Sequence, residues 1–149
     1  MKSRNATLLV SLVFAFLFAT IGFAAEEAGK CPMCGMNIAG NENTAYEIVY
    51  ADNTKEVYCC PHCGLYMHAT KKATVKSTRA RDFISGEWMD PDKMTFVYNS
   101  SAVPACGPSW IAFSSKEEAE KFQKGFGGTV YSSQEALTER AKQPKGMKM

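Results

Sequence analysis

Two stretches of the sequence concentrate side chains that bind soft metal ions. The first, KCPMCGMNIAG at residues 30–40, places two thiols and two thioethers between Cys31 and Met36. The second, YCCPHCGLYMHA at residues 58–69, adds three thiols, a methionine and both histidines of the chain. Thiolates and thioethers suit Cu(I), Zn(II) and iron, so the two stretches indicate a metal site.

Each stretch contains the pattern Cys-Pro-x-Cys-Gly. Two thiolates three residues apart can bind one ion if the chain turns tightly between them, and a glycine after the second cysteine permits such a turn. Four thiolates from Cys31, Cys34, Cys60 and Cys63 would close a tetrahedral site of the structural zinc type. The 25 residues between Cys34 and Cys60 slightly exceed the usual spacing of a zinc ribbon.

Cu(I) is the favoured ion because it can also bind Met36 and Cys106, which a four-thiolate zinc site would not use. Met36 offers a soft thioether, and Cys106 lies in a loop rich in Pro and Gly that can fold over the first stretch. The candidate metal ligands are Cys31, Cys34, Met36, Cys60, Cys63, Cys106 and His62. Three alternatives stay open: zinc at the cysteine pairs with copper at Met36 and Cys106, a disulfide between Cys59 and Cys106, and a redox-active Cys-x-x-Cys pair.

Residues 1–24 have the charged, apolar and small-residue order of a secretory signal peptide, with cleavage expected near Ala24. Export would put six cysteines in an oxidising compartment, where three disulfides are the ordinary expectation. Adjacent Cys59 and Cys60 are awkward to pair in this way, which favours metal binding. Lys30 before Cys31 argues against a lipid anchor, so the mature protein is expected to be periplasmic or otherwise exported, without a membrane span.

Composition excludes several classes of function. Without residues 1–24, the chain has 15 basic and 15 acidic side chains, so its formal charge is near zero. No basic patch stands out, which argues against nucleic acid as a partner. The sequence has no recognisable Ser-His-Asp set, carboxylate pair or phosphate-binding loop, so an enzyme is not expected.

Alternating apolar residues and turn signals predict a small α+β domain with a mostly antiparallel sheet and two or three short helices. Strands are expected at residues 44–50, 55–60, 74–84, 94–100, 110–113 and 127–132. One helix is expected from Pro61 to about Lys72, and two more after the capping-box residues Ser115 and Ser132. Residues 85–93 are expected to form a turn. The predicted organisation is a signal peptide at 1–24, a metal-binding domain at 25–142 and a disordered tail at 143–149.

The motif CPMCGM resembles the Cys-x-x-Cys-Gly-Met signature of NosL-like proteins, accessory factors of nitrous oxide reductase. The segments ARDFISGEWMDPDKMTFVYNS and IAFSSKEEAEKFQKGFGGTVYSSQEAL are similar to the rest of that domain, so the resemblance covers residues 31 to about 140. It implies a periplasmic chaperone for Cu(I), with Cys31, Cys34 and Met36 as ligands and a fold similar to the organomercurial lyase. Its partner would be a periplasmic copper enzyme such as nitrous oxide reductase. The cluster CCPHCG and Cys106 depart from the family pattern.

Overall fold

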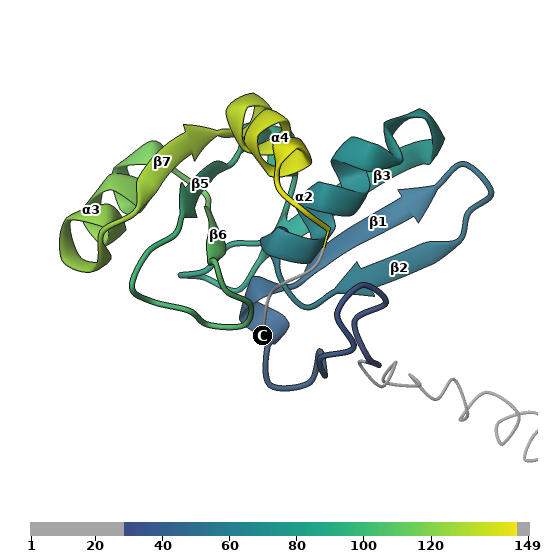
Figure 1. Ribbon diagram of the computed structural model, residues 1–149, viewed down its shortest axis with the longest axis horizontal. Helices are drawn as coiled ribbons and strands as arrows, with labels where there is room; N and C mark the ends of the chain where they lie inside the picture. Colours follow the sequence, from purple (N-terminus) through teal and green to yellow (C-terminus); the bar gives the residue numbers. More distant parts are fainter. Residues whose placement is uncertain (1–28, 146–149) are drawn as a thin grey trace, which may run out of the picture.

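The computed structural model describes residues 29–145 (Figure 1). The predicted signal peptide lies outside these residues. Within them, none of the helices has the length and apolar character needed to cross a membrane. The predicted α+β class is confirmed, because the described chain folds into three α-helices and two antiparallel sheets.

The first sheet has the strand order β2-β1-β3-β4, and all its pairs are antiparallel. Its strands are β1 (Tyr46–Tyr50), β2 (Lys55–Tyr58), β3 (Val75–Arg81) and β4 (Trp88–Met89). The predicted hairpin of β1 and β2 is confirmed, and the N–H of Tyr50 donates to the C=O of Thr54 at 2.9 Å across its turn.

Strand β4 lies within residues 85–93, which the sequence predicts to be a turn, so that prediction is wrong for Trp88 and Met89. The turn is shorter than predicted because Asp82 closes it: the Asp82 carboxylate accepts the N–H of Ser85 at 2.7 Å. Its own N–H donates to the C=O of Glu87 at 2.9 Å. The chain is therefore already reversed at Trp88, and β4 can pair with β3.

The second sheet places β5 (Thr95–Tyr98) between β6 (Trp110–Phe113) and β7 (Thr129–Ser132). The strands are thus divided between two sheets, where the sequence suggested one. The helices are α2 (Pro61–Thr70), α3 (Lys116–Phe126) and α4 (Ser133–Lys142). All three begin where the sequence predicts. The side chain of Ser115 accepts the N–H of Glu118, and Ser132 forms a capping box with Glu135.

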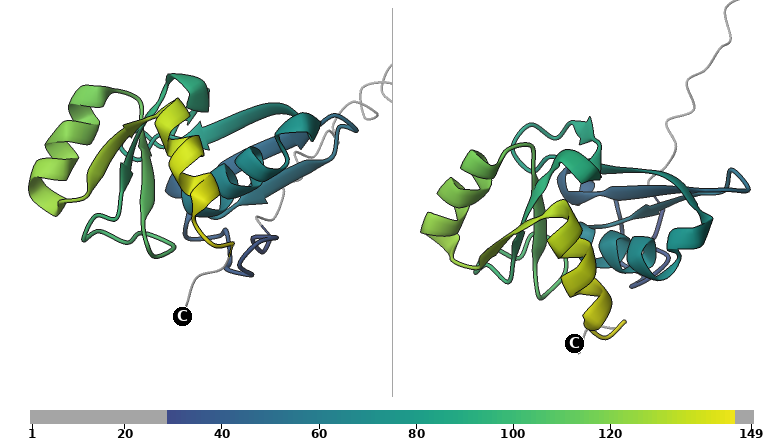
Figure 2. Two further views of the ribbon diagram at one scale, coloured as in Figure 1. Left: turned by 45° about the horizontal axis from the view of Figure 1, so that its top comes forward. Right: turned by 90° about the horizontal axis from the view of Figure 1, so that it is seen from above.

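Alternate residues of β5 and β6 point to opposite faces of the second sheet. Phe96 joins a core that contains Leu65 of α2 and Ala136 of α4. Val97 packs instead with Ala119 of α3. The helices α3 and α4 therefore cover opposite faces, and α4 lies beside α2 in the space between the two sheets (Figure 1 and Figure 2). All the buried cysteines belong to the core on this inner side.

Helix α2 approaches strand β1 closely at Gly64. A Cβ atom at this position would lie 2.2 Å from the ring carbon Cγ of Tyr46, a distance that packed atoms do not tolerate. Glycine is thus required for the close approach of helix and strand, and it fixes the height of the α2 N-terminus above the first sheet.

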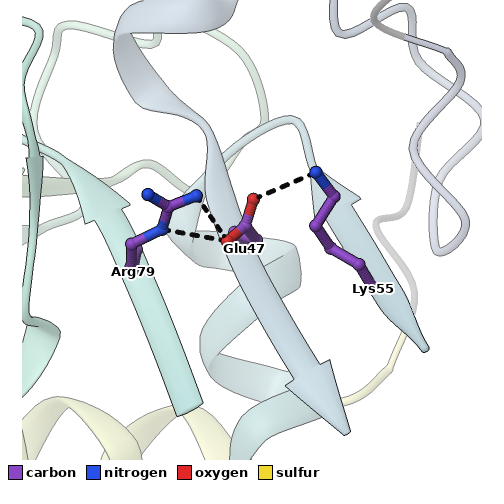
Figure 3. A network of polar contacts seen from close by, with 3 residues as sticks. All are labelled: Glu47, Lys55 and Arg79. Atoms are coloured by element: carbon purple, nitrogen blue, oxygen red, sulfur yellow. Dashed lines mark hydrogen bonds and ion pairs between the residues drawn. The ribbon is translucent and has the colours of Figure 1, made fainter. Parts of the chain in front are cut away.

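The outer face of the first sheet carries a buried carboxylate. Glu47 is only 5% exposed, and Figure 3 shows it between Arg79 of β3 and Lys55 of β2. Arg79 donates from Nε and from a terminal nitrogen to the same carboxylate oxygen, at 2.9 and 2.7 Å. Trp88 lies under the guanidinium groups of Arg79 and Arg81. These charges hold β1, β2 and β3 in register on the side away from α2.

Candidate metal centre

The first cysteine pair lies on a tight loop that precedes β1. The N–H of Cys31 donates to the C=O of Met36, and the N–H of Gly35 donates to the C=O of Cys31, both at 2.8 Å. Gly35 has φ of 74°, in the left-handed region that glycine tolerates best. The predicted turn around Cys31 and Cys34 is therefore confirmed, with glycine in the predicted role.

The second pair lies at the junction between β2 and α2. Cys60 is the N-cap of α2, and its C=O accepts the N–H groups of Cys63 and Gly64 at 3.1 and 3.0 Å. This copy of the motif lies at the start of a helix, which begins at Pro61 as predicted, whereas the first copy forms a tight turn. The N-terminus of a helix favours negative charge, which suits thiolates at Cys60 and Cys63.

Cys106 lies in the loop between β5 and β6. Its two ends are joined at Ser100 and Ser109: the N–H of Ser100 donates to the Ser109 hydroxyl at 3.0 Å. The N–H of Asn99 donates to the C=O of Ser109 at 2.8 Å. The irregular loop predicted at 103–109 is confirmed, and it brings Cys106 to within 3.9 Å of Cys34, measured between their sulfur atoms.

All six cysteines are free thiols in the structure, and their sulfur atoms form one cluster. The Sγ atom of Cys59 lies 3.5 Å from that of Cys34 and 3.5 Å from that of Cys106. The Sγ atoms of Cys63 and Cys106 are 4.0 Å apart. A disulfide would need about 2.05 Å, so the alternative of a Cys59–Cys106 disulfide does not describe this state.

Two sets of four sulfur atoms have the spacing of a metal site, with every pair in a set within 4.8 Å. The first set is Cys31, Cys34, Cys59 and Cys63. The second set is Cys59, Cys60, Cys63 and Cys106. Both sets therefore contain Cys59 and Cys63.

Cys59 is a candidate ligand that was not predicted from the sequence. The motif spacing assigned Cys60 to the site with Cys31, whereas the structure places Cys59 there and Cys60 in the other set. Both residues follow the last residue of β2, and both are buried. The sequence did contain a signal for Cys59, namely its position next to Cys60 between a predicted strand and a predicted helix. Two adjacent thiols at such a junction can both face one metal site.

Access to the cluster is uneven. Cys34 is exposed, whereas the other five cysteines are at most 2% exposed. Met36 is half-buried and packs against the same core. Cys34 is thus the one thiol of the cluster that solvent or another protein could reach. Met36 follows it by two residues in the chain.

Hydrogen bonds within the cluster distribute the protons unequally. Bonding to Cys59 lowers the pKa of Cys31 and that of Cys106. Bonding to Cys106, and then to Cys59, holds the pKa of Cys60 well below its usual value. The same kind of contact, first with Cys106, raises the pKa of Cys59 and of Cys63. In the metal-free cluster Cys59 and Cys63 therefore hold their protons more firmly than Cys31, Cys60 and Cys106, and a bound metal ion must displace the protons of its ligands.

His62 does not join either sulfur set. Its Nδ1 lies 3.0 Å from the C=O of Pro108, which can only accept, so this nitrogen carries the proton. Its Nε2 lies 3.1 Å from a terminal nitrogen of Arg140 and accepts from it. Burial, followed by the charge of Arg140, lowers the pKa of His62. With both ring nitrogens hydrogen-bonded, His62 connects α2 to the Cys106 loop and has no ring nitrogen free for a metal ion.

Arg140 of α4 is fully buried beside the cluster. Its Nε donates to the C=O of His62 at 2.8 Å, and its guanidinium lies 4.7 Å from the ring centre of Tyr66. Among residues 29–145 no carboxylate forms an ion pair with it. Burial lowers the pKa of Arg140, and the neighbouring Cys63 and Cys60 oppose this by favouring its charged form. This cation therefore offsets negative charge on the thiolates. The predicted disordered tail begins with Gln143 and Pro144, whose carbonyl groups also accept from Arg140.

The chain matches a known protein family. Residues 22–140, most of the chain, match the family described as NosL. The chain belongs to the NosL family. A solved structure with the same fold is described as the copper chaperone NosL from Shewanella denitrificans. It superposes with a TM-score of 0.64 at 22% sequence identity, covering 73% of this chain and 90% of the other.

The chain is also similar to a protein that is described as a transcriptional repressor. The HTH-type transcriptional repressor CutR of Bacillus subtilis (strain 168) is 32% identical over 98 residues. The match covers 65% of this chain and 52% of the repressor, so this chain spans about half the length of that curated relative. A stretch similar to this chain thus also occurs within a longer protein that is described as a transcriptional repressor.

Proposed function

We propose that this protein is an exported metallochaperone that binds Cu(I) through its thiol cluster and delivers it to a periplasmic copper enzyme. Nitrous oxide reductase is the client that the family resemblance indicates. The observation that carries the proposal is the convergence of six free thiols in a NosL-family chain, with Cys34 alone of them exposed. Soft thiolate ligands favour Cu(I), and an exposed ligand allows a recipient protein to begin ligand exchange.

Anaerobic loading with Cu(I), followed by competition with a chromophoric chelator, tests this function. We expect the wild-type protein to bind Cu(I) more tightly than a Cys31→Ser/Cys34→Ser variant, because the variant loses both thiols of the first loop, including the exposed one. The variant should also fail to pass copper to a copper-free acceptor enzyme. Equal affinity in the two proteins would contradict the proposal.

The alternative function is a binding module in which Zn(II) has only a structural role. Its support is that four thiolates in either set would complete a tetrahedral zinc site. In such a module the energy of metal binding is folding energy, so a chelator should unfold the protein. A chelator-stripped protein that stays folded and then takes up copper would exclude this alternative.

Met36 separates the two functions further. A closed four-thiolate zinc site has no place for a thioether, whereas a transfer site benefits from a neutral ligand that is weaker than a thiolate. We expect Met36→Ala to lower the Cu(I) affinity about tenfold, or about 1.4 kcal/mol. Thermal unfolding of the metal-free protein should stay nearly unchanged, because Met36 is only half-buried.

Met33→Ala is the matched control for Met36→Ala. Met33 lies on the same loop, is also half-buried and packs against the same core, but it is not a predicted ligand. Chelator competition on the two variants should therefore reveal weaker copper binding only for Met36→Ala. Similar affinities for the two would leave the thiols alone as ligands.

A further inference from the structure

We propose that the six cysteines hold two metal ions in a single cluster, in which the thiolates of Cys59 and Cys63 bridge the two ions. This inference rests on the proposed function in taking Cu(I) as the cargo. It adds the number of ions and the assignment of bridging and terminal ligands, which neither the family membership nor the motif spacing provides.

The overlap of the two sulfur sets carries the argument. Each set contains four sulfur atoms that all lie within 4.8 Å of one another, and the two sets have only Cys59 and Cys63 in common. Two four-coordinate sites that share one edge use six ligands, of which two bridge. Cys31 and Cys34 are then the terminal ligands of an outer ion. Cys60 and Cys106 are the terminal ligands of an inner ion.

The distances between sulfur atoms fit such a cluster. A tetrahedral ion with metal–sulfur bonds of about 2.3 Å separates its ligand atoms by roughly 3.8 Å. The Sγ atom of Cys59 lies 3.5 Å from that of Cys106 and 3.7 Å from that of Cys60. Cys63 and Cys106 are 4.0 Å apart at sulfur. Metal binding would therefore require only small displacements of Cys59, Cys60, Cys63 and Cys106 relative to one another. The Sγ atoms of Cys34 and Cys106 are 3.9 Å apart and would have to move apart, because terminal ligands of two different ions lie farther from each other than ligands of one ion.

A single ion would leave part of the cluster unexplained. Four-coordination by the outer set uses Cys59 and Cys63 and leaves the buried thiols of Cys60 and Cys106 without a metal. A second ion would use these two thiols, and Cys59 is placed to bind both ions. Its sulfur contacts Cys34 of the outer pair and also both members of the inner pair. A thiolate sulfur has lone pairs for two ions. Thiols that are protonated beforehand release their protons to solvent as metal–sulfur bonds form.

The adjacent residues Cys59 and Cys60 provide a matched pair of variants, since both are buried. The full chain is titrated with Cu(I) under anaerobic conditions and observed by native mass spectrometry with chelator competition. Wild type should saturate at two copper ions. Cys60→Ser should keep one tightly bound ion in the intact outer set. Cys59→Ser interrupts both sets and should weaken all copper binding at least tenfold. Saturation of wild type at one ion, or equal behaviour of the two variants, would overturn the inference.

Loading the wild-type chain with NMR-active cadmium tests the bridge without any substitution. Two cadmium signals that are coupled to each other through sulfur are expected, because a shared thiolate transmits spin coupling between the two nuclei. A single signal, or two signals without mutual coupling, would refute the bridging arrangement. Failure of the proposed function has a different signature, since wild type would then bind no Cu(I) in the titration even if cadmium fills the cluster.

Discussion

Replacing Gly64 by alanine should lower the free energy of unfolding by about 3 kcal/mol, at the upper end of the usual cost of overpacking. The added methyl group would lie 2.2, 2.4 and 2.5 Å from the Cγ, Cδ1 and Cβ atoms of Tyr46. The Cβ atom of Tyr46 is fixed to β1, so rotation of the ring alone cannot relieve the contact. Helix α2 must move away from the first sheet, and the melting temperature should fall by roughly 10 °C or more.

The same variant should bind copper poorly, because Cys60 and Cys63 move with the N-terminus of α2. The control is Gly125→Ala in α3, where nothing lies within 4 Å of the added atom. Alanine is the better helix former by up to about 1 kcal/mol, so this variant should be as stable as wild type or slightly more stable. Thermal unfolding of both variants checks the prediction. An unchanged melting temperature for Gly64→Ala would mean that the helix does not approach β1 as closely as described.

Replacing Arg140 by methionine should weaken Cu(I) binding by at least tenfold, or about 1.4 kcal/mol. A loaded thiolate cluster keeps an excess of negative charge, and Arg140 is the buried cation beside it. The substitution also removes the donor to Nε2 of His62 and one donor to the C=O of His62, which lies within α2. Unpaired buried acceptors cost about 1–3 kcal/mol each, so the metal-free protein should lose about 2 kcal/mol of stability as well.

Arg140→Lys separates the two contributions of the arginine. Lysine keeps the positive charge but lacks the planar fork that binds two acceptors of His62 at once. Copper affinity, measured by chelator competition, should therefore recover in large part, whereas stability in urea should recover little. Wild-type affinity in Arg140→Met would show that the guanidinium serves only to hold α4, α2 and the tail together.

Local signals in the sequence predicted most of the secondary structure. The serines at 115 and 132 mark the starts of α3 and α4 because a capping side chain acts within one helical turn. Pro61 marks the start of α2 for a similar reason, since proline suits the first turn of a helix. The short strand β4 was not predicted because its two residues pair only after Asp82 has reversed the chain. The Asp82 carboxylate accepts a local hydrogen bond from the N–H of Ser85 and a tertiary one from the N–H of Ser114.

The candidate site could be predicted only in part from the same signals. Spacing identified the pair at Cys31 and Cys34 and the turn at Gly35, all of which are local properties. The exchange of Cys59 for Cys60 could not be predicted by spacing, since the depth of α2 against β1 decides which thiol faces the first loop. The role of Arg140 also depends on tertiary structure, because α4 must return beside α2 before a surface-type residue becomes a buried cation.

Because the Cys106 loop and the first loop meet at the cluster, two metal ions joined by bridging thiolates would act as a reversible cross-link of the chain. Cys34 and Cys106 are 72 positions apart in the sequence, yet their sulfur atoms are 3.9 Å apart. Closing a ring of that size permanently restricts an unfolded chain by roughly 4 kcal/mol on a chain-entropy account. Copper release would remove this restriction at the moment of delivery, so the emptied protein should be cut more readily by proteases than the loaded one. A cell could thus clear carriers that have given up their cargo without a separate recognition signal.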